Sequence, residues 1–261
     1  MPASFYEPDG DRFVSTELTR GPWDPDFQHA GPPAALLGRE VERLEDAEDF
    51  QVARISFEIM RAVPIVALRV EARVTRPGRR VQLVEGSLSD EEGEVMRATA
   101  WRLRTAPVEL PELPNGEAPP GPESAEPGEF ISTGEEVGYH TAMEYRFLEG
   151  AFTELGPAKV WMRMRQPLVG GEQPSPLQRV LTAADSGNGV SVTLDWTRFL
   201  FINVDLSVYL ERMPVGEWVC LDAVTRPQPN GIGVADTLLL DERGRIGRGL
   251  QSLLVSQRSD A

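Results

Sequence analysis

The sequence predicts an α+β fold made of two tandem units, each a helix followed by antiparallel strands. The first observation behind this prediction is a repeat. The tetrapeptide VTRP occurs at residues 74–77 and again at 224–227, and the flanking stretches 63–77 and 213–227 align without a gap. The second is that a helix-like segment precedes strand-like segments in both halves of the chain. A period of about 150 residues is too long for a solenoid and fits two copies of a small domain.

The first unit begins with a predicted helix over residues 31–46. Pro32 and Pro33 suit its opening turn, because the backbone N–H groups there have no partner within the helix. Behind them an apolar face recurs at helical spacing, formed by Ala34, Leu37, Val41 and Leu44. Three strands with turn signals between them are predicted to follow, over residues 66–75, 79–90 and 94–104.

A stretch rich in proline and glutamate, residues 106–130, separates the two units. Proline removes backbone hydrogen-bond donors and acidic side chains repel one another, so this stretch is predicted to be an extended linker over the surface. It divides the chain into an N-terminal domain, residues 1–105, and a C-terminal domain, residues 131–261.

The second unit repeats the plan with a predicted helix over residues 175–189. Ser175 is its expected N-cap and Gln178 completes a capping box, while glycines 187 and 189 suit its C-terminal end. Four strands are predicted to follow, over residues 201–210, 217–225, 232–240 and 250–257. Two such units that join edge to edge form one pseudo-symmetric continuous sheet and leave fewer exposed strand edges.

Charge and composition exclude several classes of function. The formal net charge of −15 disfavours nucleic acid and anionic membranes as partners. No apolar run approaches the roughly 20 residues that a membrane-spanning helix needs, and the first residues do not resemble a signal peptide. The single cysteine, Cys220, can form no internal disulfide and reads as a core residue, and no Cys/His set predicts a metal site. A cytoplasmic location is expected.

Four stretches resemble the TesB-like double-hotdog acyl-CoA thioesterases in their order and spacing. They are FQHAGPPAALLGREVE (27–42), SPLQRVLTAADSGNG (175–189), FINVDLSVYLER (201–212) and GRGLQSLLVSQR (247–258). The resemblance implies a double hotdog, in which each unit wraps an antiparallel sheet around a long helix. It implies hydrolysis of acyl-CoA to free acid and CoA, as in fatty acid metabolism, without metal, cofactor or covalent intermediate. Many members of the family assemble further, so a homo-oligomer is expected.

The resemblance also implies which residues do the chemistry. In the family, a carboxylate, a hydroxyl residue and a glutamine of the second half hold and activate the attacking water. These positions fall on Asp185, Asn203 and Gln251. Asparagine replaces the hydroxyl residue, and its amide can still orient a water by donating and accepting hydrogen bonds. In the first half, His29 and Gly31 are expected to bind substrate, with His29 at the entrance of the acyl pocket or capping the first helix.

The residues themselves support a centre in the second half. Asp185 lies at the predicted C-terminal end of a helix, where the helix dipole disfavours a carboxylate. Either it is a general base there, or it only terminates the helix. Gln251 lies in an apolar strand, so its amide is hydrogen-bonded if buried, or else it faces solvent. In the repeat these two residues align with about Ala35 and Ala100, which predicts a single working centre.

Two other functions stay open. A non-catalytic acyl-CoA-binding module would explain the loss of the hydroxyl residue at Asn203, and it would bind acyl-CoA without cleaving it. A hotdog enoyl-CoA hydratase would use the pair Asp24 and His29, whose spacing resembles that family, for acid–base catalysis. A serine hydrolase is not expected, because the chain has no G-x-S-x-G motif.

Overall fold

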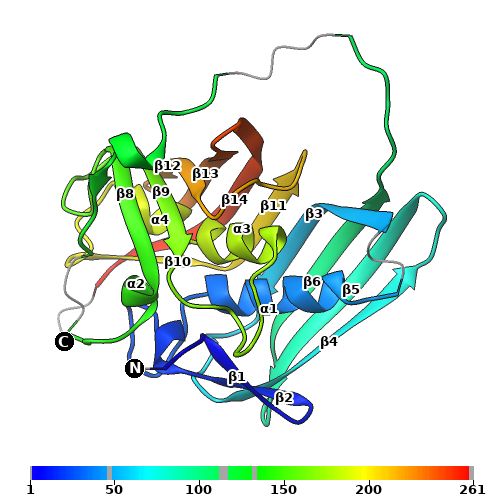
Figure 1. Cartoon of the computed structure of the whole chain (residues 1–261). Helices are drawn as coiled ribbons and strands as arrows, with labels where there is room; N and C mark the ends of the chain where they lie inside the picture. Colours follow the sequence, from blue (N-terminus) through cyan, green and yellow to red (C-terminus); the bar gives the residue numbers. More distant parts are fainter. Residues whose placement is uncertain (1, 46–48, 112–116, 131–133, 259–261) are drawn as a thin grey trace.

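The computed structural model describes residues 2–45, 49–111, 117–130 and 134–258. A single 14-stranded sheet curls around two central helices, α1 (Gly31–Glu42) and α3 (Pro176–Ala184), which contact each other inside the curve (Figure 1). The predicted architecture, two tandem helix-plus-sheet units joined in one continuous sheet, is confirmed.

The first half contributes six strands in the sheet order β1-β2-β4-β5-β6-β3. They are β1 (Tyr6–Asp9), β2 (Arg12–Ser15), β3 (Phe50–Ile59), β4 (Ala67–Arg76), β5 (Val81–Asp90) and β6 (Gly93–Arg104). The three predicted strands correspond to β4, β5 and β6. The helix ends at Glu42, short of the predicted end at residue 46, which lies outside the described residues. β3 is not among the predicted strands. A bulge between Val52 and Arg54 interrupts its two-residue rhythm near the start, and only the part from Arg54 to Ile59 alternates.

The second half continues the sheet in the order β11-β14-β13-β12-β9-β8-β7, with β10 paired to β14. The strands are β7 (Glu126–Pro127), β8 (Met143–Glu149), β9 (Ala158–Met164), β10 (Phe199–Asn203), β11 (Asp205–Leu210), β12 (Val219–Pro227), β13 (Ile232–Asp241) and β14 (Gly244–Gln257). The strand predicted over residues 201–210 is two strands, β10 and β11, which are interrupted at Val204. β10 pairs with β14, and β11 pairs with β14 and with β3.

The two halves share one topology. In each, a helix is followed by four strands, and the strands stand in the sheet in the equivalent orders β3-β6-β5-β4 and β11-β14-β13-β12. The halves meet where β3 and β11 pair antiparallel, with Ser56 opposite Ser207 and their hydroxyls 2.9 Å apart. This contact marks the pseudo-two-fold axis. Residues of the two halves that this axis relates here are 151 positions apart in the sequence.

The register corrects the gap-free alignment of the repeat. In β5, Val84 pairs with Val74, and its counterpart Ala235 in β13 pairs with Thr225. The structural counterpart of Val74 is therefore Thr225 and not Val224. A bulge between Val74 and Arg76 in β4 absorbs one residue, so the two copies come into step again only at Arg76 and Arg226. The VTRP match identifies the duplication but misplaces most of β4 by one residue.

The linker leaves β6 over exposed residues, and its last part packs on the outer face of the sheet (Figure 1). The Trp161 Nε1–H donates to the Pro120 carbonyl at 2.8 Å, and Ala125 packs with Trp161, Trp218 and Cys220 in a small cluster separate from the main core. Burial there raises the pKa of the Cys220 thiol to about 12, so the thiol stays protonated. None of the described helices has the length and apolar character to span a membrane.

Candidate active site

The predicted helix over residues 175–189 is interrupted. Its start is as predicted, because the Ser175 hydroxyl accepts from the Gln178 N–H at 3.1 Å, although the Gln178 side chain turns to Glu42 and leaves the capping box half formed. α3 ends at Ala184, and a short helix, α4 (Gly187–Val190), resumes after Asp185 and Ser186. The prediction that the glycines end the helix is wrong. Gly187 lies so close to β13 that an added Cβ would be 2.3 Å from Thr237 Oγ1.

At this interruption, the Asp185 carboxylate contacts residues from three other segments. Its Oδ1 accepts from Asn203 Nδ2 at 2.8 Å and from Gln251 Nε2 at 3.0 Å. Its Oδ2 lies 3.0 Å from His29 Nδ1. The side chain of Asp185 is only 5% exposed, so hydrogen bonds from these partners, rather than from water, stabilise this carboxylate. The structure thus brings four of the sequence-selected residues to one place.

Gln251 points into the protein from the middle of β14 and is 3% exposed. Its Nε2 donates both to the backbone oxygen and to the carboxylate of Asp185, and its Oε1 accepts from the Asn188 N–H at 3.1 Å. The amide is therefore fully engaged and does not face solvent. It ties the break between α3 and α4 to the sheet.

His29 brings the first half into the site. It lies just before α1, and its ring stacks on Tyr139 with the centroids 3.8 Å apart and the planes within 8°. The Tyr139 hydroxyl in turn donates to the Thr182 carbonyl at 2.7 Å and lies 3.0 Å from Ser186 Oγ. No sequence signal singles out Tyr139, which stands outside any periodic pattern. The site is therefore a composite of both units.

Gly31 lies where the two central helices cross. A Cβ at this position would be 2.3 Å from the Thr182 carbonyl oxygen, so the residue lets α1 and α3 approach closely. Its N–H also lies 3.1 Å from His29 Nδ1. In the structure, Gly31 allows the two helices to pack closely beside the site.

Asp24 does not join His29. It is exposed, and its Oδ1 accepts from the Asp26 N–H at 2.9 Å, whereas the carboxylate beside His29 belongs to Asp185. Among the described contacts, Asp24 and His29 therefore do not form the pair that the hydratase interpretation requires. His140 also lies apart from the site and stacks on Phe130.

The first half has no equivalent polar centre. Thr99 and Leu250 occupy equivalent places opposite Ser56 and Ser207, so the next residues, Ala100 and Gln251, are structural counterparts. The same separation of 151 positions makes Val52 the structural counterpart of Asn203, and the Val52 side chain is buried. At these two described positions, apolar side chains stand where the second half has amides, so they offer no comparable hydrogen-bonding groups.

Comparison with known proteins identifies the family. The profile of the acyl-CoA thioesterase C-terminal domain matches residues 110–255, more than half of the chain, and that of the N-terminal domain matches residues 19–103. The chain belongs to the acyl-CoA thioesterase family. A comparison with the curated proteins finds no match.

Solved structures share the fold of this thioesterase over nearly its whole length. A conserved protein of unknown function with a hot dog fold, from Alicyclobacillus acidocaldarius, has a TM-score of 0.72 at 14% identity, over 99% of this chain and 97% of its own. An acyl-CoA thioesterase II from Mycobacterium marinum has a TM-score of 0.65 at 15% identity, over 96% of this chain and 95% of its own. The predicted double-hotdog fold is confirmed.

The histidine of the thioesterase site is expected to make stability depend on pH. Burial lowers the pKa of His29, and the Asp185 charge opposes this only in part. The unfolded chain therefore takes up this proton first as the pH falls below about 6.5, and the free energy of unfolding decreases by at most about 1.4 kcal/mol per pH unit. Denaturant unfolding of the wild type and of His29→Gln between pH 8 and pH 5 measures this. Parallel stability curves for the two proteins would contradict it.

Proposed function

We propose that this thioesterase hydrolyses acyl-CoA by direct attack of a water that Asp185 deprotonates, with no covalent intermediate. The observation that carries the proposal is the Asp185 carboxylate itself: it is nearly buried, it is held by two neutral amides, and a histidine lies against its second oxygen. Neutral donors hold the carboxylate in place by hydrogen bonds and add no charge of their own to the site.

The two amides take different roles. Both N–H bonds of Gln251 are directed at Asp185 and its oxygen is taken by Asn188, so Gln251 positions the base. Asn203 donates to Asp185 through Nδ2, while its Oδ1 accepts no hydrogen bond within the part of the chain that the structure describes. That oxygen is available to accept from the attacking water, in the way a hydroxyl residue would.

His29 completes the arrangement from the first half. A proton on its Nδ1 is favoured, because an ionised carboxylate 3.0 Å away is a stronger partner than the Gly31 N–H. Nε2 is then a hydrogen-bond acceptor at the edge of the site, where it can accept from a water or from an N–H group of the substrate. Because His29 and Asp185 come from different halves and contact each other directly, the thioester is expected beside this contact, at the junction of the two halves.

In the reaction, the water oxygen forms a bond to the thioester carbonyl carbon as Asp185 takes the proton. Backbone N–H groups stabilise the oxyanion that results. Collapse of this intermediate breaks the carbon–sulfur bond, and the CoA thiolate leaves with the proton from Asp185. We also propose, from the family, a homo-oligomer that works in cytoplasmic fatty acid metabolism.

Release of free thiol from a panel of acyl-CoAs of different chain length tests the function. Turnover of at least one thioester supports hydrolysis. Binding of acyl-CoA without any thiol release would instead support a non-catalytic binding module, which the asparagine at position 203 keeps open. Hydration of an enoyl-CoA without thiol release would support the hydratase.

Replacement of Asn203 tests how the water is held. Asn203→Ala removes one donor to Asp185 and the acceptor for the water, and it is expected to lower kcat by about 10- to 100-fold. Asn203→Thr restores a hydroxyl and should retain most of the activity. Ile202→Ala is the matched control, since Ile202 precedes Asn203 on β10 and is 46% exposed on the opposite face. Equal losses in Asn203→Ala and Ile202→Ala would refute this role.

A further inference from the structure

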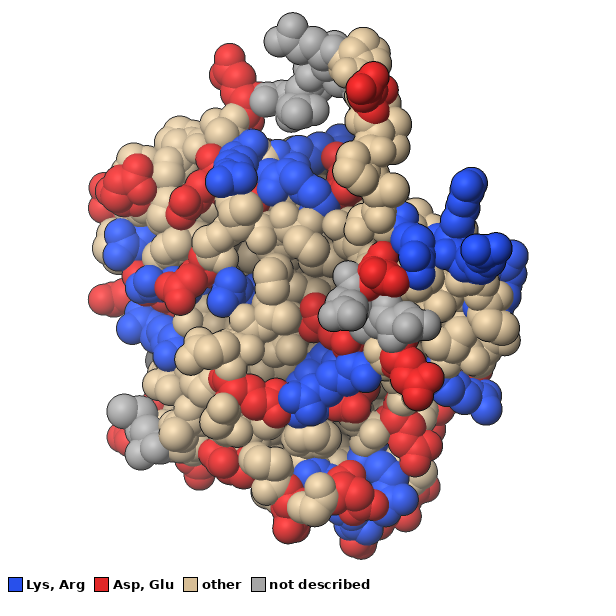
Figure 2. Space-filling view, turned by 45° about the vertical axis from the view of Figure 1, so that its right-hand side comes forward, with Lys and Arg blue, Asp and Glu red and all other residues tan. Residues whose placement is uncertain are grey.

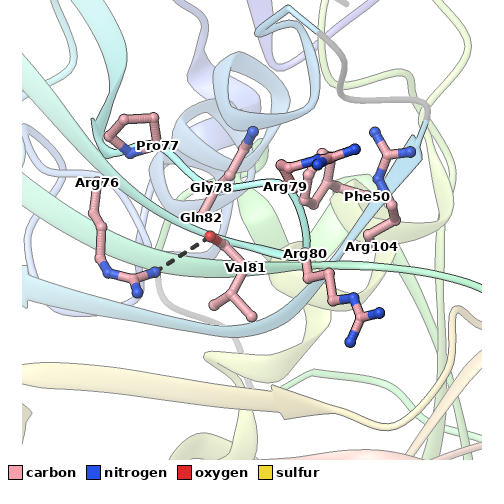
Figure 3. Close-up of a pocket in the computed structure, with 9 residues that line it drawn as sticks. All are labelled: Phe50, Arg76, Pro77, Gly78, Arg79, Arg80, Val81, Gln82 and Arg104. Atoms are coloured by element: carbon pink, nitrogen blue, oxygen red, sulfur yellow. Dashed lines mark hydrogen bonds between the residues drawn. The ribbon is translucent and has the colours of Figure 1, made fainter.

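A second candidate site lies at the far end of the first half. A groove of about 1170 Å³ opens beside the turn between β4 and β5, and the ends of β3 and β6 form its other wall. Figure 3 shows four arginine side chains around it, from the turn and from the neighbouring end of β6. They are Arg76, Arg79, Arg80 and Arg104.

These arginines concentrate positive charge on an acidic protein. The chain has 41 acidic and 26 basic residues, yet basic side chains gather at the right-hand edge of the face in Figure 2. Arg104 pairs with Asp49 at 2.8 Å, with both side chains about half exposed. Arg79 and Arg80 form no ion pair with any residue that the structure describes. The groove therefore has guanidinium groups available for an anion.

The turn is built to hold these groups in place. A Cβ on Gly78 would be 2.3 Å from the Val81 carbonyl oxygen, so only glycine allows the chain to reverse this tightly. Arg76 closes the turn by donating to the same carbonyl oxygen at 3.3 Å, the contact drawn in Figure 3. The backbone of the turn is thereby constrained, and it presents the exposed side chains of Arg79 and Arg80 at the rim of the groove.

The fold does not require those two arginines. The duplicated chain contains the same turn twice, and both copies keep the Arg-Pro pair at 76–77 and 226–227. After it the first copy reads Gly-Arg-Arg, while the second reads Gln-Pro-Asn. A turn of the same topology thus forms without Arg79 and Arg80, which points to a role in binding rather than in folding.

The groove offers more than charge. Phe50 lines it, and the guanidinium of Arg104 lies 5.3 Å from the centre of its ring. Gln82 and Val81 complete a wall that is partly apolar. The volume is far larger than a single phosphate needs, so the groove suits an anion that carries an organic portion.

This place is remote from Asp185. β3 extends from Phe50 at the groove to Ile59, whose N–H donates to the carbonyl of Val204 beside Asn203. At about 3.3 Å per residue, the two places lie roughly 30 Å apart when followed along this strand.

We propose that the groove binds the polyphosphate of a nucleotide, a chemistry present both in free nucleoside diphosphates and in the nucleotide end of CoA. Guanidinium groups bind phosphate oxygens in pairs with charge-assisted hydrogen bonds, and several arginines match the two or more charges of a diphosphate. Binding here is independent of the hydrolysis proposed above.

Calorimetric titration with pyrophosphate, ADP and CoA at about 0.05 M ionic strength, where screening is weak, tests the proposal. The double variant Arg79→Gln/Arg80→Gln is expected to raise the Kd for ADP by about tenfold or more, because at least two charge-assisted hydrogen bonds are lost. Arg226→Gln is the matched control, since it removes a guanidinium from the equivalent turn of the second half, and it should leave the Kd unchanged. Denaturant unfolding of the double variant, with a midpoint equal to that of the wild type, reports that it is folded.

The three ligands distinguish the sources. Binding of all three that weakens in the double variant supports a polyphosphate site open to any nucleotide. Binding of CoA alone that weakens in the same variant supports a site for CoA. Binding of ADP that the double variant leaves unchanged overturns the proposal, whatever CoA does, because CoA also binds at the site around Asp185. The absence of binding by all three ligands overturns it as well.

Discussion

Asp185→Asn is expected to lower kcat for acyl-CoA hydrolysis by about 10²- to 10⁴-fold, the range that general bases contribute. Asparagine has the shape of aspartate, and its side-chain oxygen can still accept from Asn203 and Gln251, which both donate to Oδ1. Its amide nitrogen can donate to His29 Nδ1 once the neutral imidazole carries its proton on Nε2. Asparagine cannot take a proton from water. The loss therefore measures proton transfer rather than collapse of the site, and thiol release under saturating substrate measures it.

The matched control is Asp195→Asn, at an exposed aspartate whose carboxylate accepts from Thr197 and lies outside the site. It should keep full activity. Asp185→Asn should also remain folded, because an amide is less costly to bury than a carboxylate. A folded Asp185→Asn protein with wild-type turnover would show that another group activates the water.

Gly31→Ala is expected to lower the free energy of unfolding by about 1–3 kcal/mol, as overpacked cores do. The new methyl group would meet the Thr182 carbonyl oxygen at 2.3 Å, and backbone cannot move away without parting α1 from α3. The same shift would carry His29 away from Asp185, so turnover should fall together with stability. Denaturant unfolding and thiol release measure the two effects.

Gly38→Ala is the matched control on the same helix. Its Cβ would lie 2.4 Å from a terminal methyl of Leu181, which a side-chain rotation can move. Alanine also favours a helix interior over glycine by about 1 kcal/mol, so the net change should be near zero. Equal destabilisation by both substitutions would contradict the view that Gly31 sets the distance between the helices.

Local patterns predict much of this fold. Alternation along β4, β5 and β13 reflects one buried face, and the proline-led start of α1 and the serine cap of α3 follow from backbone hydrogen bonding. Where the local rhythm is broken, prediction fails. The bulge in β3 leaves only the part from Arg54 to Ile59 in a regular alternation, and the bulge in β4 shifts the repeat by one residue.

The site shows a second limit. Asp185, Asn203 and Gln251 can be selected by resemblance, but the break after α3 depends on Gln251, which is 66 residues away in the sequence. The pairing of His29 with Asp185 and its stacking on Tyr139 depend on how the two halves are placed. No spacing within one segment contains this information, because these contacts are tertiary.

The composite origin of the site has a consequence for its behaviour on dilution. Were the two units separate polypeptides, His29 and Asp185 would part whenever the protein concentration fell below the dissociation constant of the pair. The connection between β6 and β8 keeps each unit at an effective concentration of about a millimolar with respect to the other. The proposed centre is thereby complete at any expression level, and the first unit needs no polar residues at its own equivalent positions.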